Sequence, residues 1–348
     1  MEYKITKEEL GNDWLYSTLV ALNKCMAEHG LPLYVVGARA RDVAMKLMKG
    51  DEPKRRTEDL DVAIAIEDWQ TFDDICKTLE NNHFKRHGET QKFFYKGVNG
   101  DLDFEVDIVP FGGVAVDEKI GWPPEGNPVM SVKCFQDVMN EAVTVIVNGE
   151  VEVKMAPLCG QFLIKLDTWN DRNASTDKDA EDMLFILKNY LDIQLLYQKD
   201  NVPPDVVTFD NESLDAIIWG AQWLAYDISK LLTTEHLQFY ADLASAELKK
   251  KEKSNLIYHF MKYYGNSEMG DFSSNYEPCR QIWSVFVKIF SKELEARNRS
   301  YICAAADMLT GPRRSPGSRS IPTSLRYNCS VTGSLLPRSR QIMCNCQS

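Results

Sequence analysis

Apolar and polar residues alternate with a period of two in several short segments of the first half of the chain, the spacing of a strand with one buried face. Between Leu102 and Ile108 every second residue is apolar, and two apolar runs flank Asn148-Gly149, a dipeptide that favours a two-residue hairpin turn. We therefore expect a mostly antiparallel sheet. The segments predicted as strands are 33–36, 59–66, 93–95, 101–109, 143–147 and 151–155.

Other segments have the apolar spacing of helices. Thr6 and Glu9 form a capping-box pattern that predicts a helix ending at His29-Gly30, and Asp68 is expected to cap another helix. A helix is also expected over 39–48, and from Pro157 to about residue 290 the patterns are helical. Because alternating strand and helix units are absent from this order, a Rossmann fold is disfavoured. The order predicts an α+β fold: a mixed sheet flanked by helices, followed by an α-helical C-terminal domain.

The composition changes sharply near residue 292. No lysine follows Lys292, whereas eight arginines do, and the stretch from Gly311 onward is rich in Ser, Arg, Pro and Gly. For a chain of 348 residues we predict a sheet-bearing domain over 1–156, a helical domain over 157–292 and an irregular tail over 293–348. The tail is either a disordered basic segment or not native, for example the product of a shifted reading frame.

Charge and cysteine content narrow the classes of function. The net charge of −11 disfavours broad, unspecific binding of nucleic acid, and the nine cysteines contain no CxxC pair, which argues against a zinc ribbon or a disulfide framework. No apolar run approaches the length that spans a bilayer, and the first residues lack the features of a signal peptide. We expect a cytoplasmic protein without a membrane partner.

Three aspartates are the strongest chemical signal. Asp59 and Asp61 are two apart in an expected strand, so their side chains project to the same side, and Asp107 lies in the next acid-bearing strand. Carboxylates held this close repel each other unless a cation lies between them. Three of them on adjacent strands are what a paired Mg²⁺ site for phosphoryl or nucleotidyl transfer requires. The alternative is a half-exposed strand whose acidic face is simply solvated.

Several blocks of the sequence resemble one enzyme superfamily in the same order. Val36-Gly37-Ala38-Arg39-Ala40-Arg41-Asp42, followed by Asp59-Leu60-Asp61, resembles the nucleotidyltransferase superfamily that includes DNA polymerase beta. More closely, the chain is similar to the bacterial nucleotidyltransferases grouped with the AbiEii-type abortive-infection toxins. The further matching blocks are 64–72, 106–112, 121–124, 165–172, 178–182 and, more weakly, 220–228, so the resemblance covers roughly residues 30 to 265.

The resemblance implies a nucleotidyltransferase fold and Mg²⁺-dependent transfer of a nucleoside monophosphate from an NTP to an acceptor hydroxyl. In that superfamily the acids matching Asp59 and Asp61 hold both metals, and the one matching Asp107 helps to activate the attacking hydroxyl. Gly37 would close the turn into the next helix, so that backbone N–H groups meet the triphosphate. The family's Gly-Ser is Gly37-Ala38 here, which removes one hydroxyl contact to a phosphate.

Two roles are possible for the arginines that follow Ala38. Arg39 and Arg41 could replace the lost contact by binding phosphate, or Arg41 could form an ion pair with Asp42 or another acid.

By resemblance, Lys165 would reach the β- or γ-phosphate; the alternative is a lysine that snorkels to solvent at a helix edge. Asp179 and Asp182 would be partners of Lys165 and the metals, or partners of a helix dipole. Arg172 would pair with Asp171 or orient the site, and the loop from Trp122 would stack a nucleobase or form a packed turn.

The acceptor and the biological role stay open at this point. Family members modify tRNA ends, other branches modify proteins or aminoglycoside drugs, and a toxin would have a separate antitoxin protein as partner. The expected partners are thus an NTP, an acceptor RNA or protein, and an antitoxin. The rival interpretation is a non-catalytic nucleotide-binding or interaction protein, which Ala38 favours and the retained acids oppose.

Overall fold

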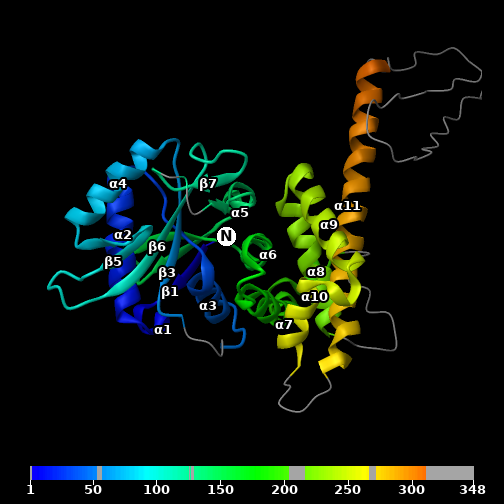
Figure 1. Cartoon of the computed structure of the whole chain (residues 1–348), viewed down its shortest axis with the longest axis horizontal. Helices are drawn as coiled ribbons and strands as arrows, with labels where there is room; N and C mark the ends of the chain where they lie inside the picture. Colours follow the sequence, from blue (N-terminus) through cyan, green and yellow to red (C-terminus); the bar gives the residue numbers. More distant parts are fainter. Residues whose placement is uncertain are drawn as a thin grey trace, which may run out of the picture. The chain divides into compact units, whose positions relative to one another are not determined.

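A mixed eight-stranded sheet occupies the first half of the chain in the computed structural model (Figure 1). The structure describes residues 2–52, 57–124, 126, 129–203, 216–265 and 272–310. The strand order is β1-β9-β10-β2-β3-β6-β5-β4, and β7 and β8 form a separate pair. The strands are β1 (Glu2–Ile5), β2 (Tyr34–Val35), β3 (Leu60–Ala65), β4 (Phe84–His87), β5 (Glu89–Tyr95), β6 (Phe104–Phe111), β7 (Lys119–Gly121), β8 (Val129–Ser131), β9 (Val143–Val147) and β10 (Val151–Met155).

The sheet is more mixed than expected, because β1 pairs with β9, β10 with β2, and β3 with β6 in parallel. The two predicted hairpins are confirmed: β5 and β6 are antiparallel neighbours, and β9 and β10 are joined by Asn148 and Gly149, both with positive φ. Strand β1 was not expected. It pairs with residues more than 140 positions away, so a local sequence pattern cannot predict the pairing.

The earlier helices pack on this sheet, and after β10 the described elements are all helical. The helices are α1 (Lys7–Leu10), α2 (Asp13–Glu28), α3 (Gly37–Leu47), α4 (Trp69–Asn81), α5 (Phe135–Asn140), α6 (Leu158–Arg172), α7 (Lys178–Gln198), α8 (Ala216–Leu231), α9 (Thr234–Lys249), α10 (Asn255–Tyr264) and α11 (Tyr276–Thr310). Helix α2 packs against β6, β10 and α4, and α3 packs against β3 and α6. The α+β prediction with a helical C-terminal region is confirmed.

Local capping explains where the early helices begin and end. The Thr6–Glu9 capping box is present, and the Asp68 side chain accepts a hydrogen bond from the Thr71 N–H at the start of α4. The single helix predicted up to Gly30 is wrong, because α1 ends at Gly11 in the left-handed conformation (φ 69°) and Asn12 caps a new helix, α2.

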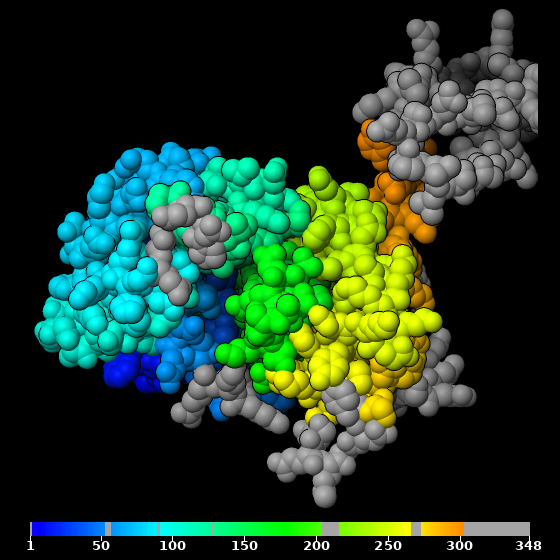
Figure 2. All heavy atoms as spheres, viewed as in Figure 1, coloured from blue at the N-terminus to red at the C-terminus, as the bar shows by residue number. Residues whose placement is uncertain are grey.

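Helices α6 and α7 connect the sheet-bearing residues to the later helices. Helix α6 packs against α3 as well as α7 and α8. In Figure 2 the green atoms of this region lie directly between the blue-to-cyan residues of the sheet and the yellow residues of the later helices. The described residues up to Tyr301 form one compact unit, and the predicted division at 156/157 remains a prediction. No helix among the described residues is long and apolar enough to cross a bilayer.

The predicted irregular tail begins later than residue 293, because α11 continues to Thr310. Leu294 is buried, and the Arg297 guanidinium donates hydrogen bonds to the backbone carbonyls of Ser229 and Leu232 and to the Glu293 carboxylate. These contacts fix the helix beyond the point where the lysines stop. The rest of the predicted tail, 311–348, lies outside the described residues.

Candidate metal and nucleotide site

Strands β3 and β6 bring the three aspartates together. Asp61 and Asp107 are direct partners in the register of these parallel neighbours, and Asp59 stands just before β3. Each of the three offers a carboxylate oxygen, and these oxygens lie within 4.8 Å of one another. All three residues are half-buried. The expectation that the three carboxylates lie close together on adjacent strands is thus met.

The alternation of the strands explains why these acids face the site. In β6, Phe104, Val106 and Ile108 are buried on one side, which turns Asp107 to the other. Asp101 and Asp103 precede the strand and are exposed, so the solvated-face alternative holds for them. It fails for Asp107, whose Oδ1 is buried and has no hydrogen-bond partner among the residues that the structure describes.

The electrostatics of the acids fit a bound cation. Burial, together with the Asp59 charge, raises the pKa of Asp61 to about 6, although Lys165 and Arg172 act to lower it. Burial and then the charge of Asp61 raise the pKa of Asp107 to about 7. A divalent cation bound by Asp59, Asp61 and Asp107 would relieve this repulsion and give the unpartnered Oδ1 a ligand bond. The residues present therefore fit Mg²⁺.

Helix α3 begins beside these carboxylates. Its first residue, Gly37, has a φ of +66°, and the Val36 N–H donates a hydrogen bond to the Asp61 carbonyl at 3.0 Å. In the part of the chain that the structure describes, no side chain caps the N-terminus of α3, whose second residue, Ala38, is buried. The first N–H groups of the helix therefore form a donor set next to the acids, suited to an anion.

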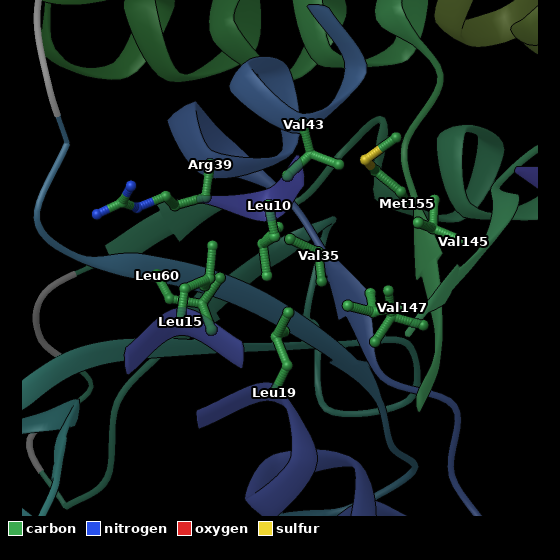
Figure 3. Close-up of a pocket in the computed structure, with 11 residues that line it drawn as sticks. Leu10, Leu15, Leu19, Val35, Arg39, Val43, Leu60, Val145, Val147 and Met155 are labelled. Atoms are coloured by element: carbon green, nitrogen blue, oxygen red, sulfur yellow. The ribbon is translucent and has the colours of Figure 1, made fainter. Parts of the chain in front are cut away.

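Arg39 lies at the edge of this site. Its Nε donates a hydrogen bond to the Asp59 carbonyl at 3.2 Å, and burial lowers its pKa despite the nearby acids Asp42 and Asp59. Arg39 also borders an apolar cavity of about 20 Å³, but its guanidinium points away from the leucine and valine side chains that line it (Figure 3). The cavity is a packing void of the core, whereas the guanidinium belongs to the polar site.

Arg41 is an internal ion-pair residue. It is only 3 % exposed, its Nε and Nη2 bind the Asp42 carboxylate at 3.0 and 2.7 Å, and its Nη1 binds the Asp182 carboxylate. Its guanidinium also lies over the Phe185 ring. Of the two sequence interpretations of Arg41, the ion pair is the one that the structure contains.

Lys165 is held by two acids of α7. Its Nζ lies 2.8 Å from Asp182 Oδ2 and 3.4 Å from Asp179 Oδ1, and its side chain is 16 % exposed, so it does not snorkel to solvent. Burial lowers the pKa of Lys165, but Asp182 and Asp179 outweigh this effect and the pKa is raised. Lys165 is thus a charged, buried residue near the acids of the site.

The sequence left open whether Arg172 pairs with Asp171 or orients the site. In the structure its partner is not Asp171. Asp171 accepts a hydrogen bond from the Ser131 N–H, whereas Arg172 binds both carboxylate oxygens of Asp179 at 2.8 Å. Arg172 follows Lys165 by seven residues in α6, two helical turns along the same face. That spacing was the available signal that the two cations share the acids of α7.

Trp122 is part of the core, so the base-stacking interpretation is wrong. It is fully buried, and its ring lies 5.5 Å from that of Trp69 and 5.6 Å from that of Phe72. An open groove of about 360 Å³ lies instead beside Asp59. Its lining residues are Glu58, Asp59, Phe94, Asp103 and Glu105.

Comparisons with known proteins add little. No protein-family model matches the chain, and no curated protein matches it. Among solved structures, the solution structure of the antibiotic-resistance factor ANT(2'')-Ia is similar at 15 % sequence identity and a TM-score of 0.33. The similarity covers 51 % of this chain and 85 % of that one. A likeness of this size carries no conclusion about activity.

Proposed function

We propose that the chain is a Mg²⁺-dependent nucleotidyltransferase that moves a nucleoside monophosphate from an NTP to an acceptor hydroxyl. The observation that carries this proposal is the set of three carboxylates, Asp59, Asp61 and Asp107, with oxygens within 4.8 Å of one another on adjacent strands. A structural role gives no reason to hold three acids so close without a counter-charge between them. The resemblance of residues 36–42 and 59–61 to nucleotidyltransferases agrees with it.

Each part of the site has a task in this reaction. Asp59, Asp61 and Asp107 would hold Mg²⁺, which when bound supplies charge neutralisation on the phosphates. The N–H groups at the start of α3 would bind phosphate oxygens. Asp107 would also receive the proton of the acceptor hydroxyl, the role that the family resemblance gives it. The acceptor oxygen then bonds to the α-phosphorus, and the bond to pyrophosphate breaks.

The test uses the full chain, Mg²⁺ and each α-labelled NTP in turn. Total tRNA, the protein itself and aminoglycosides are offered as acceptors, and pyrophosphate release is measured in parallel. We expect label in one acceptor class, lost in Asp61→Asn and kept in Asp101→Asn, which removes an exposed acid just before β6. NTP binding without any label or pyrophosphate would support the rival, a non-catalytic nucleotide-binding protein.

One observation favours a second candidate for the acceptor. Among the described residues, those that line the groove beside Asp59 are four acids and Phe94, and Lys92 and Lys96 pair with Glu105 and Asp103. Such a lining repels polyanionic RNA and suits a cationic acceptor, either a basic polypeptide segment or an aminoglycoside-like small molecule. Roles for tRNA as acceptor, for an antitoxin partner and for a cytoplasmic toxin rest on the family resemblance alone.

A further inference from the structure

Three cations and three acids form a continuous chain of charges between α3, α6 and α7. Arg41 binds Asp42 and Asp182, Lys165 binds Asp182 and Asp179, and Arg172 binds Asp179. The formal charges of these six side chains cancel, so this set of ion pairs is neutral as a whole. What differs between the cations is how much of each remains available to a ligand.

Arg172 is the member with an open donor. Arg41 is almost fully buried, and the Lys165 ammonium lies between two carboxylates, whereas the Arg172 side chain is 49 % exposed. Its Nε and Nη2 each bind one oxygen of Asp179 at 2.8 Å. Within the described residues these are the hydrogen bonds of the guanidinium, so the two N–H groups of Nη1 are free to donate.

Asp179 fixes the direction of that open donor. Its side chain is fully buried in the first turn of α7, and a bidentate pair holds a planar guanidinium in one orientation. Arg172 is the last residue of α6, the helix that packs against α3, and α3 begins beside Asp61. Arg172 is also close enough to Asp61 for its charge to lower the pKa of that carboxyl.

We propose that Arg172 donates from Nη1 to a phosphate oxygen of the nucleotide, and that Asp179 is the positioning residue that aims it. The inference rests on the proposed function, because it names the phosphate contact of the same site. It assigns the phosphate-binding role to Arg172 in place of the ion-paired Arg41. Lys165 then contributes by holding Asp179 and Asp182 through its ion pairs.

Isothermal titration with inorganic tripolyphosphate in Mg²⁺ tests the contact without turnover and without a nucleobase. Arg172→Gln is expected to bind about 10- to 100-fold more weakly than the wild type, the effect of losing one charge-assisted hydrogen bond. Arg172→Lys keeps the positive charge but loses the planar guanidinium, so its affinity should lie between those of Arg172→Gln and the wild type.

Arg280→Gln is the matched control. Arg280 pairs with Glu277 through the same two nitrogens, and its side chain is 42 % exposed, but it lies on α11 and not on the helices α3, α6 and α7. It should bind tripolyphosphate like the wild type. Arg172→Gln leaves the buried Asp179 paired with Lys165, and Arg280→Gln leaves an exposed Glu277, so both variants are expected to fold, which thermal unfolding verifies.

The outcomes separate this inference from the proposed function. If the wild type binds tripolyphosphate and Arg172→Gln binds it equally well, the contact is refuted while nucleotidyl transfer stands. If Arg172→Lys matches the wild type, the positioning role of Asp179 is refuted. If the wild type binds neither Mg²⁺-tripolyphosphate nor any NTP, both proposals are wrong.

Discussion

Gly37 and Asp61 are packed so closely that residue 37 can have no side chain. A methyl carbon at position 37 would lie 2.6 Å from Cγ of Asp61 and 2.8 Å from its Cβ, well inside van der Waals contact. The backbone of Gly37 also has a φ of +66°, a conformation that side chains disfavour. The first turn of α3 can therefore approach the carboxylate only because this residue is glycine.

Gly37→Ala should abolish nucleotidyl transfer and destabilise the fold by more than the backbone conformation alone would cost. The clash forces either the start of α3 or the Asp61 carboxylate out of place. Gly30→Ala is the control, since Gly30 has a φ of +67° but nothing within 4 Å of the added carbon. We expect about 1–2 kcal/mol of destabilisation for Gly30→Ala and a larger loss for Gly37→Ala, measured by urea unfolding. Equal losses would contradict the steric argument.

Mg²⁺ alone should raise the unfolding temperature. A cation bound by Asp59, Asp61 and Asp107 stabilises the folded state by about 2.7 kcal/mol at a hundredfold excess over its dissociation constant. The shift should vanish in Asp61→Asn and persist in Asp103→Asn, because Asp103 is exposed outside the triad. Scanning calorimetry with and without Mg²⁺ measures it, and an identical shift in both variants would place the cation elsewhere.

The sequence was most informative where the determinants are local. Alternation of acid and apolar residues located Asp61 and Asp107 on adjacent strands, and Asn148-Gly149 located a hairpin, because strand period and turn chemistry act over a few residues. The break between α1 and α2 was also local, at Gly11, but the apolar pattern that continues across it obscured it.

Partners far apart in the chain could not be predicted in the same way. Arg41 and Asp182 are separated by 141 positions, and their pairing follows from how α3, α6 and α7 pack. Spacing therefore left Arg41 divided between a phosphate contact and an ion pair. The register of β1 with β9 and the burial of Trp122 against Trp69 are tertiary in the same sense.

Arg41→Met should reduce stability far more than it reduces nucleotide affinity. The variant leaves Asp42 without its guanidinium partner and Asp182 with Lys165 alone, and breaking a buried ion pair typically costs 3–5 kcal/mol. Lys77→Met, which breaks the exposed pair with Asp74, should cost about 0.5 kcal/mol or less. Urea unfolding gives both values. A stable Arg41→Met protein that no longer binds an NTP would instead restore the phosphate contact.

Asp227 should make the stability depend on pH. Burial raises its pKa from 3.8 to about 6, although the hydrogen bond from the Tyr190 hydroxyl acts to lower it. The folded state thus binds this proton more tightly than the unfolded state, so the contribution is fully present below about pH 4 and is lost as the pH rises through about 6.

The difference between wild type and Asp227→Asn isolates this group. Relative to the variant, the wild type should lose on the order of 2–3 kcal/mol of stability between pH 4 and pH 7. Urea unfolding at several pH values measures the difference. If it does not change with pH, the Asp227 carboxyl does not titrate as proposed.

Truncation should show that Leu294 and Arg297 belong to the fold. Removal of everything after residue 292 would delete Leu294, which is buried, and Arg297, whose guanidinium donates to the carbonyls of Ser229 at the end of α8 and of Leu232 before α9. Losing a buried leucine alone costs about 2–5 kcal/mol. A chain ending at residue 310 keeps these contacts and should unfold like the full chain. Arg297→Gln distinguishes the guanidinium contacts from the loss of chain, because it should account for only part of the destabilisation seen on truncation at 292.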